Sequence, residues 1–160
     1  MKLLHSLANF CAVLGGVVLT VITLMTCASL IGRNTIGVTI KGDFELTALA
    51  AGAAIALFMP LCQYKRGNII VDFFTAKASD AVNAKLDRLG ALMVGLLMAL
   101  VAWRSVVGGL NAYNTNATSM MMGFPEWTVY LFMVPGLVLT AVIGMAQAFK
   151  GFDDVDGATA

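Results

Sequence analysis

The sequence predicts an all-α integral membrane protein in which four transmembrane helices form a single domain over residues 1–160. Three observations support this prediction. The chain is 59% hydrophobic and 12% charged, whereas a soluble domain carries about twice that charged fraction. Its apolar residues gather into four stretches, each close to the ~20 residues that a helix needs to cross the ~30 Å hydrocarbon core of a bilayer. The charged residues lie almost entirely between these stretches, which are residues 7–31, 44–62, 89–107 and 127–148.

The first stretch, residues 7–31, is predicted to be a retained transmembrane helix and not a cleaved signal peptide. Lys2 followed by an apolar run is common to both kinds of segment. The run is longer than the roughly 7–15 residues of an ordinary signal-peptide core, and no A-x-A-like cleavage site ends it. The stretch therefore stays in the membrane as the first span.

The second stretch, residues 44–62, is followed by a polar segment, residues 63–88, that is rich in Lys and Arg. Apolar residues recur at helical spacing over residues 70–87, which predicts an amphipathic helix lying on the membrane surface. An ordinary connecting loop with a cytoplasmic extension of the third helix is the alternative. The predicted interfacial helix is represented by Asp72, Phe73, Phe74 and Val82.

The third and fourth stretches, residues 89–107 and 127–148, share with the first two a pattern of small residues four positions apart. Helices in lipid associate where small residues let their backbones approach closely. Because the spacing recurs in all four stretches, it favours a closely packed bundle, which a short polar tail, residues 150–160, follows. The glycines predicted to lie at helix contacts are Gly16, Gly52, Gly95, Gly136 and Gly144.

The distribution of positive charge predicts the orientation of the chain in the membrane. Four spans place both termini on one side. The N-terminus, the segment 63–88 and the tail together hold seven of the ten Lys and Arg residues. Because positively charged loops stay in the cytoplasm, we expect both termini to be cytoplasmic.

Charged residues approach the membrane at its outward edge. Arg104 lies about one turn inside the third stretch, and two interpretations fit it. Its guanidinium either snorkels to the lipid headgroups or pairs with Glu45 or Glu126 in a protein contact. We hypothesise that Arg33, Glu45 and Arg104 form part of an interface on the outward side, because they are polar groups in otherwise apolar sequence.

The residue inventory argues against an enzyme. The single histidine, His5, lies near the N-terminus, whereas a four-helix membrane cytochrome usually holds haem between His pairs or His and Met. No hydrolase triad, H-E-x-x-H motif or phosphate-binding loop is present, so we expect no catalytic residue, metal or cofactor. A net charge of +1 gives no basic surface for nucleic acid. The spans also hold no deep charge of the kind that marks a transport path, so no substrate-binding residue is expected in this chain.

Five short motifs point to a known family. An arginine, Arg33, follows the first stretch, and an acidic residue, Glu45, opens the second. Residues 65–72 (KRGNIIVD) are similar to a basic-glycine-(often His)-Ile-x-Val-Asp pattern. Residues 118–127 (TSMMMGFPEW) are similar to a Thr…Pro-x-Trp segment, and Pro135-Gly136 matches a Pro-Gly pair in the last span. Together these motifs resemble the small permease subunit, the Q component, of tripartite ATP-independent periplasmic (TRAP) transporters.

The resemblance covers about residues 7–149 and departs from the family at two positions. Asn34 stands where an aromatic residue usually follows the arginine, and Asn68 stands where histidine is frequent. The resemblance implies a small subunit in a bacterial inner membrane that takes part in secondary active transport. Its expected partners are the lipid bilayer, a large multi-span permease that holds the sodium ions and substrate, and a periplasmic substrate-binding protein. In this reading the chain is a stationary scaffold, and its outer face takes part in docking the binding protein.

The resemblance further implies sodium symport of an organic acid, such as a dicarboxylate or sialic acid. Two other classes of membrane protein remain compatible with the residue pattern. One is the small membrane subunit of a tricarboxylate-type tripartite carrier, which also has four spans. The other is the membrane anchor of a respiratory complex, against which the missing histidines argue.

Overall fold

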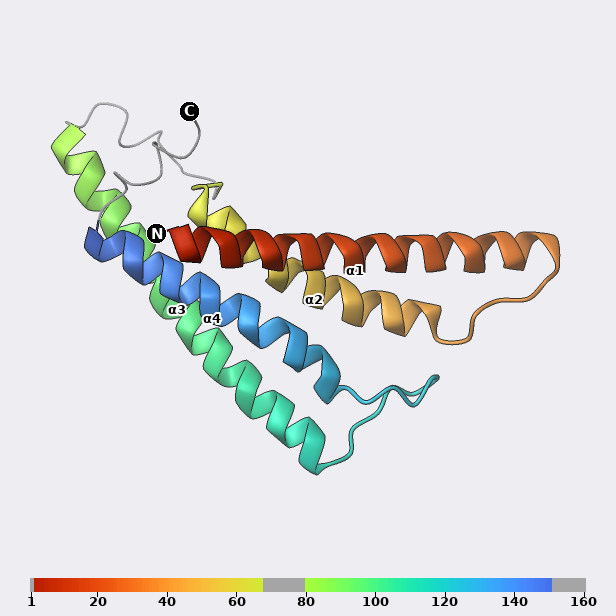
Figure 1. Cartoon of the computed structure of the whole chain (residues 1–160). Helices are drawn as coiled ribbons and strands as arrows, with labels where there is room; N and C mark the ends of the chain where they lie inside the picture. Colours follow the sequence, from red (N-terminus) through yellow and green to blue (C-terminus); the bar gives the residue numbers. More distant parts are fainter. Residues whose placement is uncertain (1, 68–79, 151–160) are drawn as a thin grey trace.

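The computed structural model describes residues 2–67 and 80–150, and these residues form four helices joined in an open row (Figure 1). All four helices are long and apolar enough to cross a membrane. The described residues contain no β-strand, apart from one isolated bridge between Thr118 and Pro125. The predicted all-α membrane fold is therefore confirmed. The helices are α1 (Lys2–Thr35), α2 (Asp43–Tyr64), α3 (Asp80–Asn114) and α4 (Trp127–Lys150).

The four helices fall into two length classes. With 22 and 24 residues, α2 and α4 are about 33 and 36 Å long at 1.5 Å per residue, close to the thickness of the hydrocarbon core. With 34 and 35 residues, α1 and α3 are each about 50 Å long. The long helices must tilt or project beyond the core, so they extend past both ends of the spans that hydropathy predicts.

The predicted interfacial helix over residues 70–87 is only partly within the described residues. Residues 80–87 are the first turns of α3 and continue into the third span without a break. Here the structure has the alternative arrangement, an extension of the third helix, in place of a separate surface helix. Val82 is an exposed residue of α3. The remainder of the segment, including Asp72, Phe73 and Phe74, lies outside the described residues, as does the tail after Lys150.

The helices pack in the order α1–α2–α4–α3, with α2 and α4 at the centre. Among the described residues the backbone of α3 approaches α4 closely and neither α1 nor α2, although Ala102 of α3 shares a buried cluster with Ala56 of α2 and Leu137 of α4. Figure 1 shows the pair α1–α2 and the pair α3–α4 meeting near the N-terminus and separating toward their connecting loops. Neighbouring helices therefore pack closely, as predicted, but α1 and α3 do not contact each other in the described residues, so the bundle is an open row.

The first residues of α2 explain why this helix begins where it does. Gly42 precedes the helix with φ at +75°, a left-handed conformation that glycine adopts without a steric penalty. Asp43 and Glu45 follow in the first turn, where negative charge is stabilised by the helix dipole. The turn from α1 into α2 is held by Gly32, whose carbonyl accepts hydrogen bonds from the N–H groups of Ile36 and Val38.

The buried core runs along α2 and α4 and is made mainly of small side chains. In contrast, the large apolar side chains of α1 and α3 are mostly exposed, for example Phe10 (65%) and Leu100 (62%). This is the pattern of helices whose outer faces meet lipid or another protein, since lipid is as apolar as leucine. Buried residues of the central pair include Ala53, Ala54, Ala56, Leu57, Leu137, Thr140, Ala141 and Ile143.

Candidate functional site

The closest helix contact joins the backbones of α2 and α4. Pro60 lies inside α2 and has no N–H, so the carbonyl of Ala56, four residues earlier, lacks its usual partner in the helix. Gly136 of α4 packs against this carbonyl, and a Cβ at position 136 would overlap its oxygen. The contact needs glycine because any side chain would push the two backbones apart.

A buried polar cluster joins the same two helices at the end of the molecule where the chain begins. The side-chain amide of Gln63 donates to Oε1 of Gln147 at 2.8 Å. Nε2 of Gln147 donates in return to the carbonyls of Gln63 (3.0 Å) and Tyr64 (3.3 Å). Gln63 is 5% exposed and Gln147 is 1% exposed. Gln147 therefore adds side-chain donors at the C-terminus of α2, where the Gln63 carbonyl also accepts the Arg66 N–H and the Tyr64 carbonyl lies beyond the regular helix bonds.

The helix α1 reaches this cluster through Tyr64. The rings of His5 and Tyr64 lie 4.9 Å apart, and Tyr64 packs with Ala8 and Ile143 in a buried group. Residues from α1, α2 and α4 thus meet at one point. His5, the single histidine of the chain, thus packs against the Tyr64 ring.

A second close backbone contact joins α3 to α4. A Cβ on Gly144 would lie 3.0 Å from Cα of Gly95 and 3.1 Å from the carbonyl oxygen of Ala91. A Cβ on Gly95 would lie 3.0 Å from the backbone nitrogen of Met145. Further along, Gly108 and Gly109 of α3 accommodate the ring of Tyr130. Glycine thus sets the spacing of α3 and α4 at both ends of their contact.

Two of the glycines predicted to lie at helix contacts do not do so. A Cβ on Gly16 or Gly52 would meet nothing within 4 Å. The residue of α1 that packs closely is Gly15, where a Cβ would lie 3.2 Å from both the Ala54 carbonyl oxygen and Cβ of Leu57. The i, i+4 spacing of small residues in the first span thus selected the wrong member of the Gly15-Gly16 pair.

Hydroxyl groups tie the C-terminal end of α1 to the start of α2. Oγ of Ser29, which is 3% exposed, donates to Oδ2 of Asp43 at 2.6 Å. The hydroxyls of Thr26 and Thr47 lie 3.2 Å apart. These bonds fix the start of α2 against α1, because a buried hydroxyl and a carboxylate have few other partners near the membrane.

The loop between α3 and α4 folds back on itself and lies against the start of α2. Within the loop, the N–H of Ser119 donates to the Phe124 carbonyl at 2.9 Å. The N–H of Met121 donates to Oε2 of Glu45 at 3.1 Å, and the side chain of Met122 lies against Gly42. The loop therefore bridges the two helix pairs on the side where they separate (Figure 1).

Replacing Glu45 by alanine should loosen this loop. The carboxylate accepts a charge-assisted bond from the Met121 N–H, and its loss is expected to cost about 1 kcal/mol, or about fivefold faster amide exchange at Met121. Hydrogen–deuterium exchange of the full chain in micelles measures this. Glu45→Gln keeps an acceptor oxygen and should change exchange less. Equal exchange in the wild type and Glu45→Ala would show that the bond does not hold the loop.

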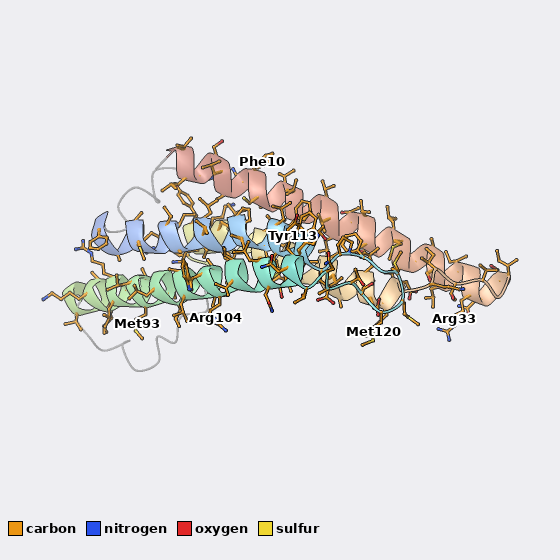
Figure 2. The ribbon with its side chains drawn as sticks, turned by 90° about the horizontal axis from the view of Figure 1, so that it is seen from below. Phe10, Arg33, Met93, Arg104, Tyr113 and Met120 are labelled. Carbon is orange, nitrogen blue, oxygen red and sulfur yellow. The ribbon has the colours of Figure 1, made fainter. Side chains whose placement is uncertain are left out.

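The three residues predicted to form an outward interface are not brought together. Figure 2 shows Arg33 at the C-terminal end of α1 and Arg104 along α3, well apart. Both side chains are exposed, and neither forms an ion pair or hydrogen bond with another described residue. Arg104 thus pairs with neither Glu45 nor Glu126 within the chain. Glu45 instead holds the loop after α3.

The described residues hold no cluster that suggests metal binding. Within residues 2–67 and 80–150, no group of three or more His, Cys, Asp or Glu side chains is arranged to hold a metal ion.

Residues that sequence reasoning missed are the polar ones in the last turns of the spans. Ser29, Gln63 and Gln147 lie near span ends, where a polar residue is usually taken to face the headgroups. Their burial is the unexpected feature. The sequence holds one signal of the contact between the two amides. Gln63 and Gln147 lie at the ends of two different spans, on the same predicted side of the membrane.

The comparisons with known proteins agree with the fold. Residues 22–154 match the family model described as tripartite ATP-independent periplasmic transporters, DctQ component. No curated protein and no solved structure matches the chain.

Proposed function

The chain belongs to the DctQ component family of tripartite ATP-independent periplasmic transporters, and we propose that it is the stationary scaffold of its transporter. Membership of this family makes the chain the small membrane subunit of such a transporter. The family match favours this class over the tricarboxylate-type carrier and the respiratory anchor. In the proposed role the chain holds one part of the large permease still while another part moves the substrate.

The rigidity of the central helices supports a scaffold role. At Gly136 and at Gly144 the helices contact backbone to backbone, and such contacts leave little room for sliding. The Gln63–Gln147 cluster adds directional bonds at one end of the same contact. A scaffold must keep its shape while its partner moves, and these contacts favour one arrangement of α2, α4 and α3.

The position of Arg104 is the observation that carries the proposal. Tyr130, in the first turn of α4, contacts Gly108, and Arg104 lies one turn before Gly108 on α3. Arg104 is therefore deeper in the membrane than the start of α4. A guanidinium at that depth is costly in lipid unless it snorkels or finds a partner. We propose that a polar or acidic group of the large permease covers this face of α3.

The outer loops suit the docking of the periplasmic binding protein. Met120 is 98% exposed and Met121 is 70% exposed, on a loop that Glu45 fixes to α2. Methionine is common at adaptable binding surfaces. Arg33, at the outer end of α1, adds a charge to the same side of the molecule. We propose both termini in the cytoplasm, because seven of the ten Lys and Arg residues then lie inside.

The remaining functional assignments follow from the family resemblance. We propose that the transporter is a sodium symporter of an organic acid such as a dicarboxylate or sialic acid. We propose that the large permease holds the sodium and substrate, because the charged residues within the predicted spans of this chain, Glu45 and Arg104, lie within about one turn of a span end and none lies near the membrane centre. No cofactor is proposed for this chain.

Co-purification from native membranes tests the proposal. A tagged chain, extracted in mild detergent, should recover a large multi-span permease in stoichiometric amount, identified by mass spectrometry. Arg104→Gln should lower that recovery about tenfold, which corresponds to about 1.4 kcal/mol of lost affinity. Lys41→Gln is the matched control, since Lys41 is an exposed outer cation that the proposal does not use.

Two results would count against this assignment. Recovery of the chain alone, or with redox subunits, would contradict the scaffold role. Equal recovery of the permease by Arg104→Gln and Lys41→Gln would mean that Arg104 snorkels to the headgroups, and the face of α3 would then be a lipid-facing surface.

A further inference from the structure

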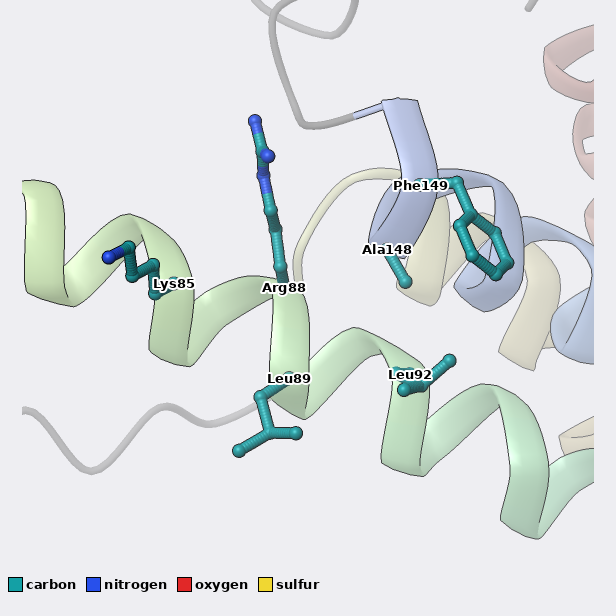
Figure 3. A pocket seen from close by; sticks show the side chains of 6 residues that line it. All are labelled: Lys85, Arg88, Leu89, Leu92, Ala148 and Phe149. Atoms are coloured by element: carbon teal, nitrogen blue, oxygen red, sulfur yellow. The ribbon is translucent and has the colours of Figure 1, made fainter.

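A pocket of about 310 Å³ lies between the start of α3 and the end of α4, at the end of the molecule where the chain begins (Figure 3). In Figure 3 Arg88 extends from α3 alongside the last turn of α4, which carries Ala148 and Phe149. The pocket combines basic and apolar side chains. It is lined by Lys85, Arg88, Leu89, Leu92, Ala148 and Phe149.

The basic residues of the pocket have no partner among residues 2–67 and 80–150. Lys85 and Arg88 lie three positions apart on α3, so they share one side of the helix. Both are exposed, and neither forms a hydrogen bond or ion pair with another described residue. No acidic residue lines the pocket, although Asp87 lies between the two cations in the sequence. Within the described part of the chain, the pocket thus presents two positive charges that no acidic side chain pairs with.

The apolar residues of the pocket continue the site toward the membrane. Leu92 lies one turn beyond Arg88 in the direction of the span, and Phe149 ends the apolar part of α4. The pocket is therefore cationic on the side away from the membrane spans and apolar on the side toward them. A phospholipid has the same polarity, with an anionic phosphate at the membrane surface and acyl chains beneath it, and basic pockets between transmembrane helices bind such headgroups.

We propose that this pocket binds an anionic phospholipid, with the phosphate between Lys85 and Arg88 and the start of an acyl chain along Leu92 and Phe149. Binding places the lipid at the end of the α3–α4 pair. It neutralises the two cations there and links the ends of these helices. The site lies outside the contacts and the outer loop on which the proposed function rests.

Native mass spectrometry of the purified full chain in mild detergent tests the site, with phosphatidylglycerol as the titrated probe. The double variant Lys85→Gln/Arg88→Gln should bind the lipid at least about fivefold more weakly, because both phosphate contacts are lost. Arg33→Gln/Lys41→Gln removes the same charge at the outer end and should bind within about twofold of the wild type. Leu92→Trp, which fills the pocket without changing charge, should also weaken binding. Circular dichroism confirms that each variant is folded.

Three results would overturn the proposal. One is equal binding by the two double variants, which would mean that net charge alone attracts the lipid. Another is displacement of the lipid by millimolar inorganic phosphate, which would indicate a site for free anions. The last is that Lys85→Gln/Arg88→Gln binds the lipid as the wild type does but no longer recovers the large permease in the co-purification. That result would make the pocket a protein contact.

Discussion

Replacing Gly136 by alanine is expected to destabilise the chain by about 2 kcal/mol, because the added methyl group overpacks a backbone contact. A Cβ at this position would overlap the Ala56 carbonyl oxygen and lie 3.2 Å from Cα of Leu57. Both neighbours are backbone atoms of α2, so they cannot turn aside as a flexible side chain can. The helices must separate, and the contact at the centre of the row weakens.

The same replacement at Gly52 or Gly16 should have the opposite sign. Nothing lies within 4 Å of a Cβ at either position. Alanine there should stabilise the chain by about 0.5–1 kcal/mol, since glycine loses more conformational freedom in a helix than alanine does. Gly144→Ala should fall between these limits, because its Cβ would meet Gly95 and Ala91 at 3.0–3.1 Å.

The free energy of unfolding of each purified variant can be measured by titrating dodecyl sulfate into neutral micelles and following helical circular dichroism. The predicted order of stability is Gly52→Ala above the wild type, then Gly144→Ala, then Gly136→Ala. If Gly136→Ala and Gly52→Ala had the same free energy of unfolding, α2 and α4 would not be in contact at Ala56. The comparison is internal, since every variant carries the same chemical change.

Hydropathy predicts the four helices well but not where they end. Residues 7–31 and 89–107 are the parts of α1 and α3 that are apolar enough for the hydrocarbon core, whereas the helices themselves run over Lys2–Thr35 and Asp80–Asn114. A helix continues into the headgroup region for as long as its residues favour helix, because water and headgroups do not prevent its internal bonds. Residues 80–87 illustrate this, since they continue the third helix.

The partner of each small residue is a tertiary property that spacing cannot supply. The span of Gly136 predicts a helix contact there but not the atom that it meets. That atom is the Ala56 carbonyl oxygen, which has no donor in its own helix because Pro60 lacks an N–H. In the first span two adjacent glycines differ by only 100° around the helix, and the pattern of small residues pointed to Gly16 where Gly15 makes the contact. The open order of the helices follows from such contacts and not from composition.

The polar contacts were the least predictable part of the molecule. Glu45 was expected to take part in an outward interface, and it accepts a hydrogen bond from Met121, 76 positions away. No local pattern relates residues at that separation. The same is true of Gln63 and Gln147, which read individually as boundary residues and are buried against each other.

Replacing Gln147 by leucine is expected to destabilise the chain by about 1–2 kcal/mol. The substitution removes the acceptor of the Gln63 amide and the donor to the carbonyls of Gln63 and Tyr64. Groups left unpaired in a buried site cost about 1–3 kcal/mol, and polar contacts between membrane helices are measured at up to about 1.7 kcal/mol. Thr140→Val is the matched control, because Thr140 is equally buried on α4 but its hydroxyl bonds only the Gly136 carbonyl of its own helix.

A double-mutant cycle separates the contact between the two amides from the effect of removing each one. Gln63→Leu and Gln147→Leu should each destabilise the chain, whereas the double variant should cost about 1 kcal/mol less than the two together, because either single variant already removes the bond between the two amides. The Gln63 and Tyr64 carbonyls still lose the bonds from Gln147 in the double variant, so stability should not return to the wild-type value. Strictly additive losses would show that each amide acts alone. The coupling measured in this way reports how firmly α2 and α4 are joined at their common end, where α1 also packs through Tyr64.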